Sequence, residues 1–337
     1  MARLKRPTIE LRDLAIGYAG KRKTKTVARN LTGTLYSGEL TCLIGSNGIG
    51  KSTLLRTLSA FQPKLGGEVL LFGKEVSTYS DKALSRLISV VLTERPSLYN
   101  TTLRDLVEMG RSPYTGFWGS LMPEDRAKVD EAIDRMRIRQ LENRLIPSLS
   151  DGEKQKGMIA KALAQDTPVI FLDEPTAFLD FPSKVEIMQL LHRLSRETRK
   201  TIFLSTHDLE LALQIADKIW LFDQEARLHI GTPEDLALEG VFTDFFSHEG
   251  IVFDLRSGLF RIENDYDRTI RFTGGRHSVT YSLVSKALLR YRIYASFRAE
   301  SEDEIEIDGG KIILRLKGRE EAHFDTIEAL VEALDYE

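Results

Sequence analysis

The residues best suited to chemistry form a glycine-rich stretch, GSNGIGKST, at positions 45–53. The stretch satisfies G-x-x-x-x-G-K-[ST] and lies between an apolar run and a helical run, which is the context that this pattern requires. Glycines let backbone N–H groups turn toward phosphate oxygens, while Lys51 can reach the terminal phosphates and Ser52 can ligate Mg²⁺. The stretch predicts a site for a nucleoside triphosphate, with an ordinary glycine-rich turn as the alternative. The expected binding residues are Gly45, Ser46, Asn47, Gly48, Gly50, Lys51, Ser52 and Thr53.

Two carboxylates follow a second apolar run, VIFLD, at positions 169–173. A buried parallel strand would deliver Asp173 and Glu174 at its carboxyl end, where open α/β sheets bind their ligands. Asp173 suits Mg²⁺ held through a water molecule, and Glu174 can act as general base toward the attacking water. An acidic pair that only caps a helix is the alternative. His207 ends another apolar run and can contact the γ-phosphate or orient the water, although a single histidine is more often structural.

Four apolar runs predict the strands that must position these residues. They alternate with segments of helical spacing, which indicates an α/β fold with a mainly parallel sheet covered by helices. The runs are LTCLIG (40–45), LISVVL (87–92), VIFLD (169–173) and TIFLST (201–206).

Three other regions have patterns of their own. Residues 8–38 combine short strands, glycines at turns and a basic loop of Lys21, Arg22, Lys23 and Lys25, which predicts an antiparallel β-layer. Residues 101–147 have helical spacing and predict a helical insertion within a domain of residues 1–250.

Residues 251–337 predict a separate small α+β domain. The segment EIEIDGGKIILRL indicates a hairpin around Asp308. A helix is expected near residues 278–290, and Asp325 with Glu328 predicts a capping box at the start of a last helix.

Composition limits the classes of function. The chain has 337 residues, enough for two domains, and its 42% apolar and 29% charged residues exclude disordered and fibrous proteins. With 47 basic and 50 acidic residues the net charge is −3, so no overall positive field favours nucleic acid, which we do not expect as a partner. The single cysteine, Cys42, fits a reducing compartment. Neither a membrane span nor a signal peptide is predicted, so the protein is expected to stay in the cytoplasm.

A further motif, LSDGEKQK at 149–156, completes a set that resembles the motifs of ATP-binding cassette (ABC) ATPases over about residues 8–240. The resemblance identifies 45–53 as the Walker A loop, IFLDE as the Walker B strand, Ala177–Asp180 as the D-loop and His207 as the switch histidine. It implies that Tyr18 stacks on adenine. It also implies that the signature residues Ser150, Gly152 and Glu153 contact the ATP of a partner subunit.

The chain departs from the family pattern in two places. Asp151 stands where the signature usually has its first glycine, and Glu153 replaces the usual glutamine. In LTERP (92–96), Thr93 takes the position of the Q-loop glutamine, with Glu94 beside it. Either Thr93 or Glu94 is therefore a candidate for contact with Mg²⁺ or the attacking water.

The resemblance also implies partners. One Walker A loop and one signature per chain imply a head-to-tail homodimer that encloses two ATP molecules. The region from TLRDLVEMG to EDRAKVDEAID resembles the ATPases of importers for iron–siderophore complexes, haem and cobalamin. In these importers, the surface corresponding to Arg111–Trp118 receives separate membrane permease subunits, which work with a substrate-binding protein. The chain is then expected at the inner face of the cell membrane.

Two functions remain as alternatives at this point: a non-transport ABC ATPase of translation or DNA repair, and a nucleotide-binding regulator without turnover. The resemblance does not extend to residues 251–337. We expect this region either to extend the dimer interface or sense a regulator, or to be a passive extension.

Overall fold

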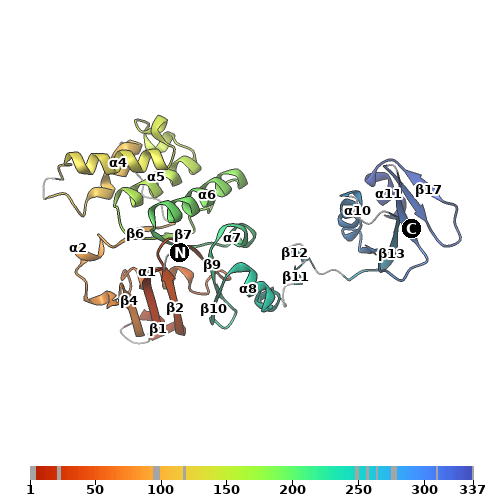
Figure 1. The fold of residues 1–337 in the computed structure, drawn as a ribbon, viewed down its shortest axis with the longest axis horizontal. Coiled ribbons are helices and arrows are strands. Elements are labelled where there is room, and N and C mark those ends of the chain that lie inside the picture. Colours follow the sequence, from red (N-terminus) through yellow and green to blue (C-terminus); the bar gives the residue numbers. More distant parts are fainter. Residues whose placement is uncertain are drawn as a thin grey trace. The chain divides into compact units, whose positions relative to one another are not determined.

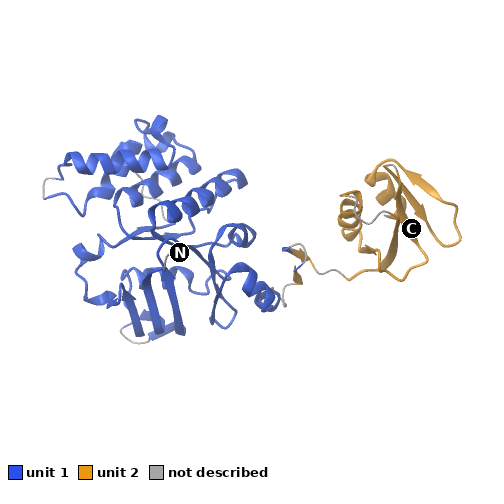
Figure 2. Ribbon diagram, viewed as in Figure 1, with its two compact units in different colours: residues 1–245, 255–259 blue, residues 246–254, 260–337 orange. Residues whose placement is uncertain are grey.

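The computed structural model describes residues 5–20, 24–93, 99–116, 119–246, 250–255, 258–262, 265–274, 279–308 and 310–335. The chain divides into two compact units, residues 1–245 with 255–259 and residues 246–254 with 260–337 (Figure 2). The expected basic residues Lys21–Lys23, together with Glu94 and Trp118, lie outside the described residues. Among the residues that are described, no helix is both long and apolar enough to cross a membrane.

The centre of the first unit is a six-stranded sheet in the order β10-β9-β3-β8-β7-β6 (Figure 1). Neighbouring strands pair in parallel except β10, which pairs antiparallel with β9. The four runs predicted as strands all form strands of this sheet, so the α/β prediction is confirmed. The strands are β3 (Leu40–Ile44), β6 (Ile88–Val91), β7 (Val169–Asp173), β8 (Thr201–Ser205), β9 (Lys218–Phe222) and β10 (Leu228–Gly231).

A second sheet of four antiparallel strands, in the order β2-β1-β4-β5, shares a hydrophobic core with the first. Its strands are β1 (Pro7–Ala19), β2 (Thr24–Tyr36), β4 (Gly66–Leu71) and β5 (Lys74–Glu75). The expectation of short strands with glycines at turns was wrong in part, because Gly17 and Gly33 lie inside long strands. A Cβ atom on Gly17 would lie 2.1 Å from the Lys25 carbonyl oxygen, and one on Gly33 would lie 3.0 Å from the Trp220 ring. These glycines therefore permit close packing and are not turn residues.

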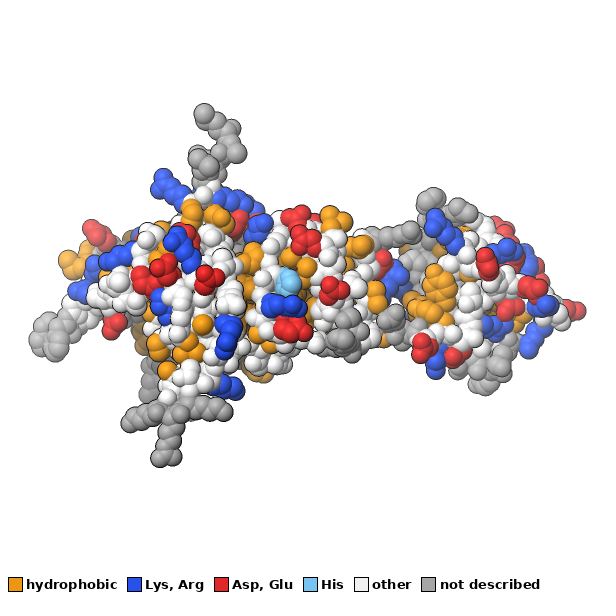
Figure 3. Space-filling view, turned by 90° about the horizontal axis from the view of Figure 1, so that it is seen from below, with side chains coloured by type: hydrophobic (Ala, Val, Ile, Leu, Met, Phe, Trp, Pro, Cys, Tyr) orange, Lys and Arg blue, Asp and Glu red, His pale blue; other side chains and the backbone are white. Residues whose placement is uncertain are grey.

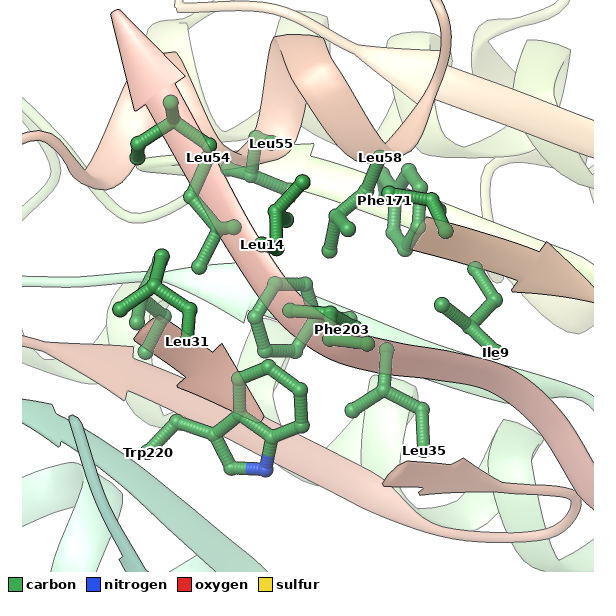
Figure 4. Close-up of a cluster of buried hydrophobic side chains, with 14 of the residues drawn as sticks. Ile9, Leu14, Leu31, Leu35, Leu54, Leu55, Leu58, Phe171, Phe203 and Trp220 are labelled. Atoms are coloured by element: carbon green, nitrogen blue, oxygen red, sulfur yellow. The ribbon is translucent and has the colours of Figure 1, made fainter. Parts of the chain in front are cut away.

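The hydrophobic core between the two sheets fixes helix α1 (Lys51–Leu58) at the end of β3. Figure 4 shows leucines of β1, β2 and α1 gathered around Phe171, Phe203 and Trp220. Phe203 packs edge-on against Phe171 and Trp220, with ring centroids 5.8 and 5.1 Å apart. Since all three rings are fully buried, they pack β7, β8 and β9 tightly into the core that also contains the apolar side of α1.

Helices cover the rest of the first unit. In the region expected to be a helical insertion, α3 and α4 pack on α5. The contact requires Gly157 of α5, because a Cβ atom at this position would lie only 2.5 Å from Leu103 Cδ1. The helices are α2 (Asp81–Leu84), α3 (Leu103–Glu108), α4 (Pro123–Arg135), α5 (Asp151–Ala164), α6 (Phe181–Thr198), α7 (Leu209–Ile215), α8 (Pro233–Leu238) and α9 (Val241–Phe246), with 3₁₀ turns at 76–78, 109–111, 139–141 and 146–148. On the face of the molecule in Figure 3, acidic and basic side chains are intermixed.

The second unit contains a five-stranded sheet in the order β14-β13-β15-β16-β17, and a separate pair, β11 and β12. Helices α10 and α11 pack on the apolar face of the larger sheet in a core of their own. The predicted hairpin is confirmed, because β15 and β16 pair antiparallel with Asp308 opposite Lys311. The elements are β11 (Ile251–Asp254), β12 (Leu259–Ile262), β13 (Arg268–Gly274), α10 (Val279–Leu289), β14 (Ile293–Ser296), β15 (Glu304–Asp308), β16 (Lys311–Arg315), β17 (Ala322–Phe324) and α11 (Ile327–Asp335).

The predicted capping box of the last helix was placed one residue too early. The Ala329 N–H donates to Thr326 Oγ1 at 3.2 Å, so Thr326 rather than Asp325 provides the capping side chain. A threonine hydroxyl, like a carboxylate, can accept a hydrogen bond from a free N–H of the first turn.

Candidate nucleotide-binding and catalytic site

The loop of residues 45–50 joins β3 to α1 and depends on glycine. Gly48 has φ +79° and Gly50 has φ +122°, in the region that side chains disfavour. A Cβ atom on Gly50 would also lie 2.5 Å from Val27 Cγ1. Because Gly50 is the N-cap of α1, no side chain caps the first turn of this helix. Its N–H groups and positive dipole end fit an anionic phosphate.

Lys51 begins α1 and folds back into this loop. Its Nζ donates to the carbonyl oxygens of Gly45 at 2.7 Å and Ser46 at 3.1 Å, and the side chain is buried. Burial lowers the pKa of Lys51, and the negative charges of Glu174 and Asp173 oppose this shift without cancelling it. A buried cation with only partial compensation favours an anion beside it. The loop is therefore suited to bind the phosphates of a nucleotide.

Oxygen atoms from three elements meet at Asp173, the last residue of β7. Ser52 Oγ of α1 donates to Asp173 Oδ1 at 3.1 Å, and Ser205 Oγ of β8 donates to the same oxygen at 2.6 Å. Hydroxyl and carboxylate oxygens are the ligands that Mg²⁺ prefers, usually with water and phosphate completing the shell. Ser52 and Asp173 thus fit a Mg²⁺ ion bound together with a triphosphate.

Glu174 follows directly and has an unusual backbone, with φ +49°. Its N–H donates to Ser205 Oγ at 2.9 Å, which helps to hold the strained conformation. His207 Nδ1 lies 3.6 Å from Glu174 Oε2, and the histidine is about half exposed at 49%. The two residues expected to be catalytic therefore lie together at the edge of the sheet where β7 and β8 end.

Two other predicted residues lie at the margins of this site. Thr93 Oγ1 donates to the main-chain oxygen of Asp173 at 2.9 Å, so Thr93 contacts the Walker B segment in this structure. Tyr18 OH lies 3.1 Å from Thr53 Oγ1, and the ring is 49% exposed. An aromatic face beside the phosphate loop is available for stacking with a base.

The signature residues form the start of another helix, α5. Ser150 is its N-cap, and its Oγ accepts from the Glu153 N–H at 3.3 Å while Glu153 Oε2 accepts from the Ser150 N–H at 2.8 Å. This capping box gives Glu153 a local structural role. Gly152 lies against Ser183 of α6, whose Oγ is 3.2 Å from the ideal Cβ position. Asp151 is exposed and its carboxylate is 3.8 Å from Lys154 Nζ.

The expectation that Arg111 lies on the surface that receives permease subunits was wrong. Arg111 is only 6% exposed, and its guanidinium forms hydrogen bonds of 2.9 Å with Asp125 Oδ1 and 2.8 Å with the Ala164 carbonyl oxygen. The same group lies 3.9 Å from the centroid of the Tyr114 ring. All these partners are within the unit, so Arg111 joins α4 and α5 and is not available to another protein.

Ser205 belongs to none of the motifs in the sequence, although its side chain links both acidic residues of the site. Ser205 is fully buried and lies directly opposite Asp173 in the parallel register of β7 and β8. The sequence does contain a signal for this role, because Ser205 is a polar residue at the end of the mainly apolar strand TIFLS, just as Asp173 is at the end of VIFLD.

Comparisons with known proteins agree with this geometry. The family model of the ABC transporter matches residues 28–177. The achromobactin transport ATP-binding protein CbrD of Dickeya dadantii is 35% identical over 71% of this chain and 87% of its own length. The cobalamin import ATP-binding protein BtuD of Halobacterium salinarum is 32% identical over 81% of this chain and 69% of its own length.

A solved dimeric ABC transporter cassette superposes with a TM-score of 0.58 at 25% identity, covering 67% of this chain and 98% of the cassette. The chain therefore belongs to the family of ABC transporter ATP-binding proteins.

Proposed function

We propose that the chain is the ATP-hydrolysing subunit of an importer that takes up an iron–siderophore, haem or cobalamin-type compound through separate membrane permease subunits. The observation that carries this proposal is the convergence of Lys51, Ser52, Asp173 and Glu174 at one edge of the sheet. These residues come from the start of α1, the end of β7 and the turn after β7, and together they provide a phosphate-binding cation, oxygen ligands and a base.

Each residue has a distinct role in the proposed hydrolysis. Lys51 and the backbone of residues 45–50 bind the β- and γ-phosphates of ATP. Ser52 holds Mg²⁺ directly and Asp173 holds it through water, and the ion neutralises phosphate charge when bound. Glu174 accepts a proton from the attacking water. His207, 3.6 Å from the Glu174 carboxylate, orients that water or contacts the γ-phosphate.

We propose that a second copy of the chain completes each site. The signature residues Ser150, Gly152 and Glu153 lie at the N-terminus of α5, whose dipole favours an anion. In the D-loop, Phe178 is 85% exposed, and Phe181, just beyond it, is 68% exposed. Exposed aromatic side chains beside a polar site are typical of a protein interface. The dimeric cassette structure supports the same arrangement.

The type of substrate rests on the named relatives, which serve achromobactin and cobalamin transport. The permease subunits would bind the compound, and ATP-driven closure of the dimer would drive their change of conformation. Since Arg111 is buried, we place the permease contact at residues 112–116. The chain would then act in the cytoplasm at the inner face of the cell membrane, and residues 251–337 would form an accessory unit.

An uptake assay tests the importer proposal. Cells of the native host that lack this chain would be supplied with the wild type or with Glu174→Gln, and uptake of labelled ferric siderophores, haem and cobalamin would be measured. We expect the wild type to restore uptake of one of these compounds and Glu174→Gln to fail, with both proteins at equal levels in the membrane fraction. Uptake of all three compounds that does not depend on the chain would contradict the proposal.

A further inference from the structure

A groove of about 620 Å³ lies between α10 and α11 in the second unit. Its floor is apolar and comes from both helices, with Ala287 and Val331 almost fully buried and Ile327 partly so. Leu283 lies at its edge and remains 50% exposed. A half-exposed leucine beside an apolar floor leaves surface that another protein surface could cover.

The two sides of the groove carry opposite charges. Lys286 and Arg290 lie four residues apart on and just after α10, and Glu328 and Glu332 lie four residues apart on α11. All four side chains are exposed, and within the described part of this unit none of them forms an ion pair. Like charges four residues apart on a helix repel each other, so each pair weakens its own helix slightly.

The helix dipole explains only part of this pattern. Glu328 in the first turn of α11 and Arg290 just beyond the end of α10 each have a favourable interaction with their helix end. Lys286 lies in the last turn of α10, where the dipole also favours a cation, whereas Glu332 lies in the last turn of α11, where the dipole disfavours an anion. The groove therefore has a basic row on one side of its apolar floor and an acidic row on the other. A complementary partner would place acidic side chains opposite the basic row and basic side chains opposite the acidic row.

We propose that a second copy of this chain occupies the groove. A surface with one basic row and one acidic row is complementary to itself when a two-fold axis runs parallel to the groove between the two copies, because the α10 row of each copy then faces the α11 row of the other. The two copies would bury the leucines and form ion pairs across the interface in both directions. This inference specifies how the proposed accessory unit acts: it holds two chains together without ATP.

The self-association of the full chain without nucleotide tests this proposal, since cassette closure through ATP cannot contribute. Sedimentation equilibrium at low ionic strength should show a dimer that weakens as salt is added. Lys286→Glu/Arg290→Glu should raise the dimer dissociation constant about 10- to 30-fold, because several exposed attractions become repulsions. The matched control Arg298→Glu/Lys311→Glu changes the net charge equally at exposed positions outside the groove and should leave the dimer unchanged.

A charge-exchange experiment makes the test specific for this groove. Lys286→Glu/Arg290→Glu gives two acidic rows, and Glu328→Lys/Glu332→Lys gives two basic rows. At a protein concentration near the wild-type dissociation constant, each variant alone should therefore be mainly monomeric. An equimolar mixture should form heterodimers at least as tightly as the wild type dimerises, and all four changes in one chain should restore the homodimer. Unchanged ATP hydrolysis and thermal unfolding midpoints would show that the variants fold.

Three results would overturn the proposal. They are a wild type that remains monomeric without nucleotide, variants that dimerise as the wild type does, and a mixture that stays monomeric. A monomeric wild type whose groove variants lose membrane association would assign the groove to a permease instead of a second copy. Failure here would leave hydrolysis and uptake untouched, so it is distinguishable from failure of the importer proposal.

Discussion

Replacing Ser205 with alanine should separate catalysis from nucleotide binding. The Ser205 hydroxyl donates to Asp173 Oδ1 at 2.6 Å and accepts from the Glu174 N–H at 2.9 Å. Asp173 keeps its second hydrogen bond, from Ser52 Oγ at 3.1 Å, after the replacement. Glu174 loses the partner of its N–H while its backbone stays at φ +49°. The replacement therefore acts mainly on the orientation of Glu174.

The magnitude follows from these contacts. Leaving a polar group at the site without its hydrogen bond costs about 1–3 kcal/mol, and a strained backbone costs about 1–3 kcal/mol when nothing holds it. If about 1–2 kcal/mol of this cost is added to the activation free energy of hydrolysis, kcat falls about 5- to 30-fold. The KM for ATP should change little, because residues 45–53 keep their conformation.

Steady-state phosphate release with separate kcat and KM values is the assay, and Ser195→Ala is the matched control. Ser195 is also fully buried, and its Oγ donates to the His192 carbonyl oxygen in α6 at 2.7 Å, away from the carboxylates. Both variants should lose about 1 kcal/mol of stability. Only Ser205→Ala should lower kcat. Equal kcat values for the two variants would show that Ser205 does not orient Glu174.

Three more results are expected. Glu174→Gln should retain ATP binding and lower kcat about 10²- to 10⁴-fold, the usual contribution of a positioned base; normal turnover in a phosphate-release assay would remove Glu174 from the mechanism. Arg111→Glu should lower the free energy of unfolding by about 3–5 kcal/mol, because it breaks a buried ion pair, and denaturant titration would detect this. Burial favours protonation of Asp125, but the Met122 N–H and the Arg111 guanidinium outweigh this and lower its pKa. The ionised Asp125 carboxylate therefore stabilises the fold above its unfolded pKa of about 4, and this stabilisation is lost as the pH falls through the lowered pKa of the folded state. Because asparagine cannot titrate, the melting temperature of Asp125→Asn should fall less steeply with acid than that of the wild type.

The sequence predicted the parallel strands and the phosphate loop well because both depend on local signals. Apolar runs such as LTCLI and TIFLS are short, continuous and followed by polar residues, which is typical of buried parallel strands. In the loop, Gly50 has φ +122°, and the motif already required glycine at that position.

Other features depend on contacts between distant residues and could not be predicted. Arg111 resembles a surface residue in its local sequence, and its burial requires Asp125 and the Ala164 carbonyl oxygen, which lie 14 and 53 residues further along the chain. Gly33 lies within a strand, and the need for glycine there comes from Trp220, whose ring would be 3.0 Å from a Cβ atom at this position. The capping residue Thr326 adjoins the predicted Asp325, and local sequence could not decide between two suitable neighbours.

If ATP joins two chains through a site that each chain only half provides, the mass of Glu174→Gln in solution must depend on nucleotide. The measurement is sedimentation equilibrium with and without Mg-ATP, in a chain that also carries Lys286→Glu and Arg290→Glu so that the groove cannot contribute. We expect mainly monomer without nucleotide and a dimer with Mg-ATP, and adding Ser150→Arg should restore the monomer while ATP stays bound. A monomer at an ATP concentration that saturates binding would contradict the claim.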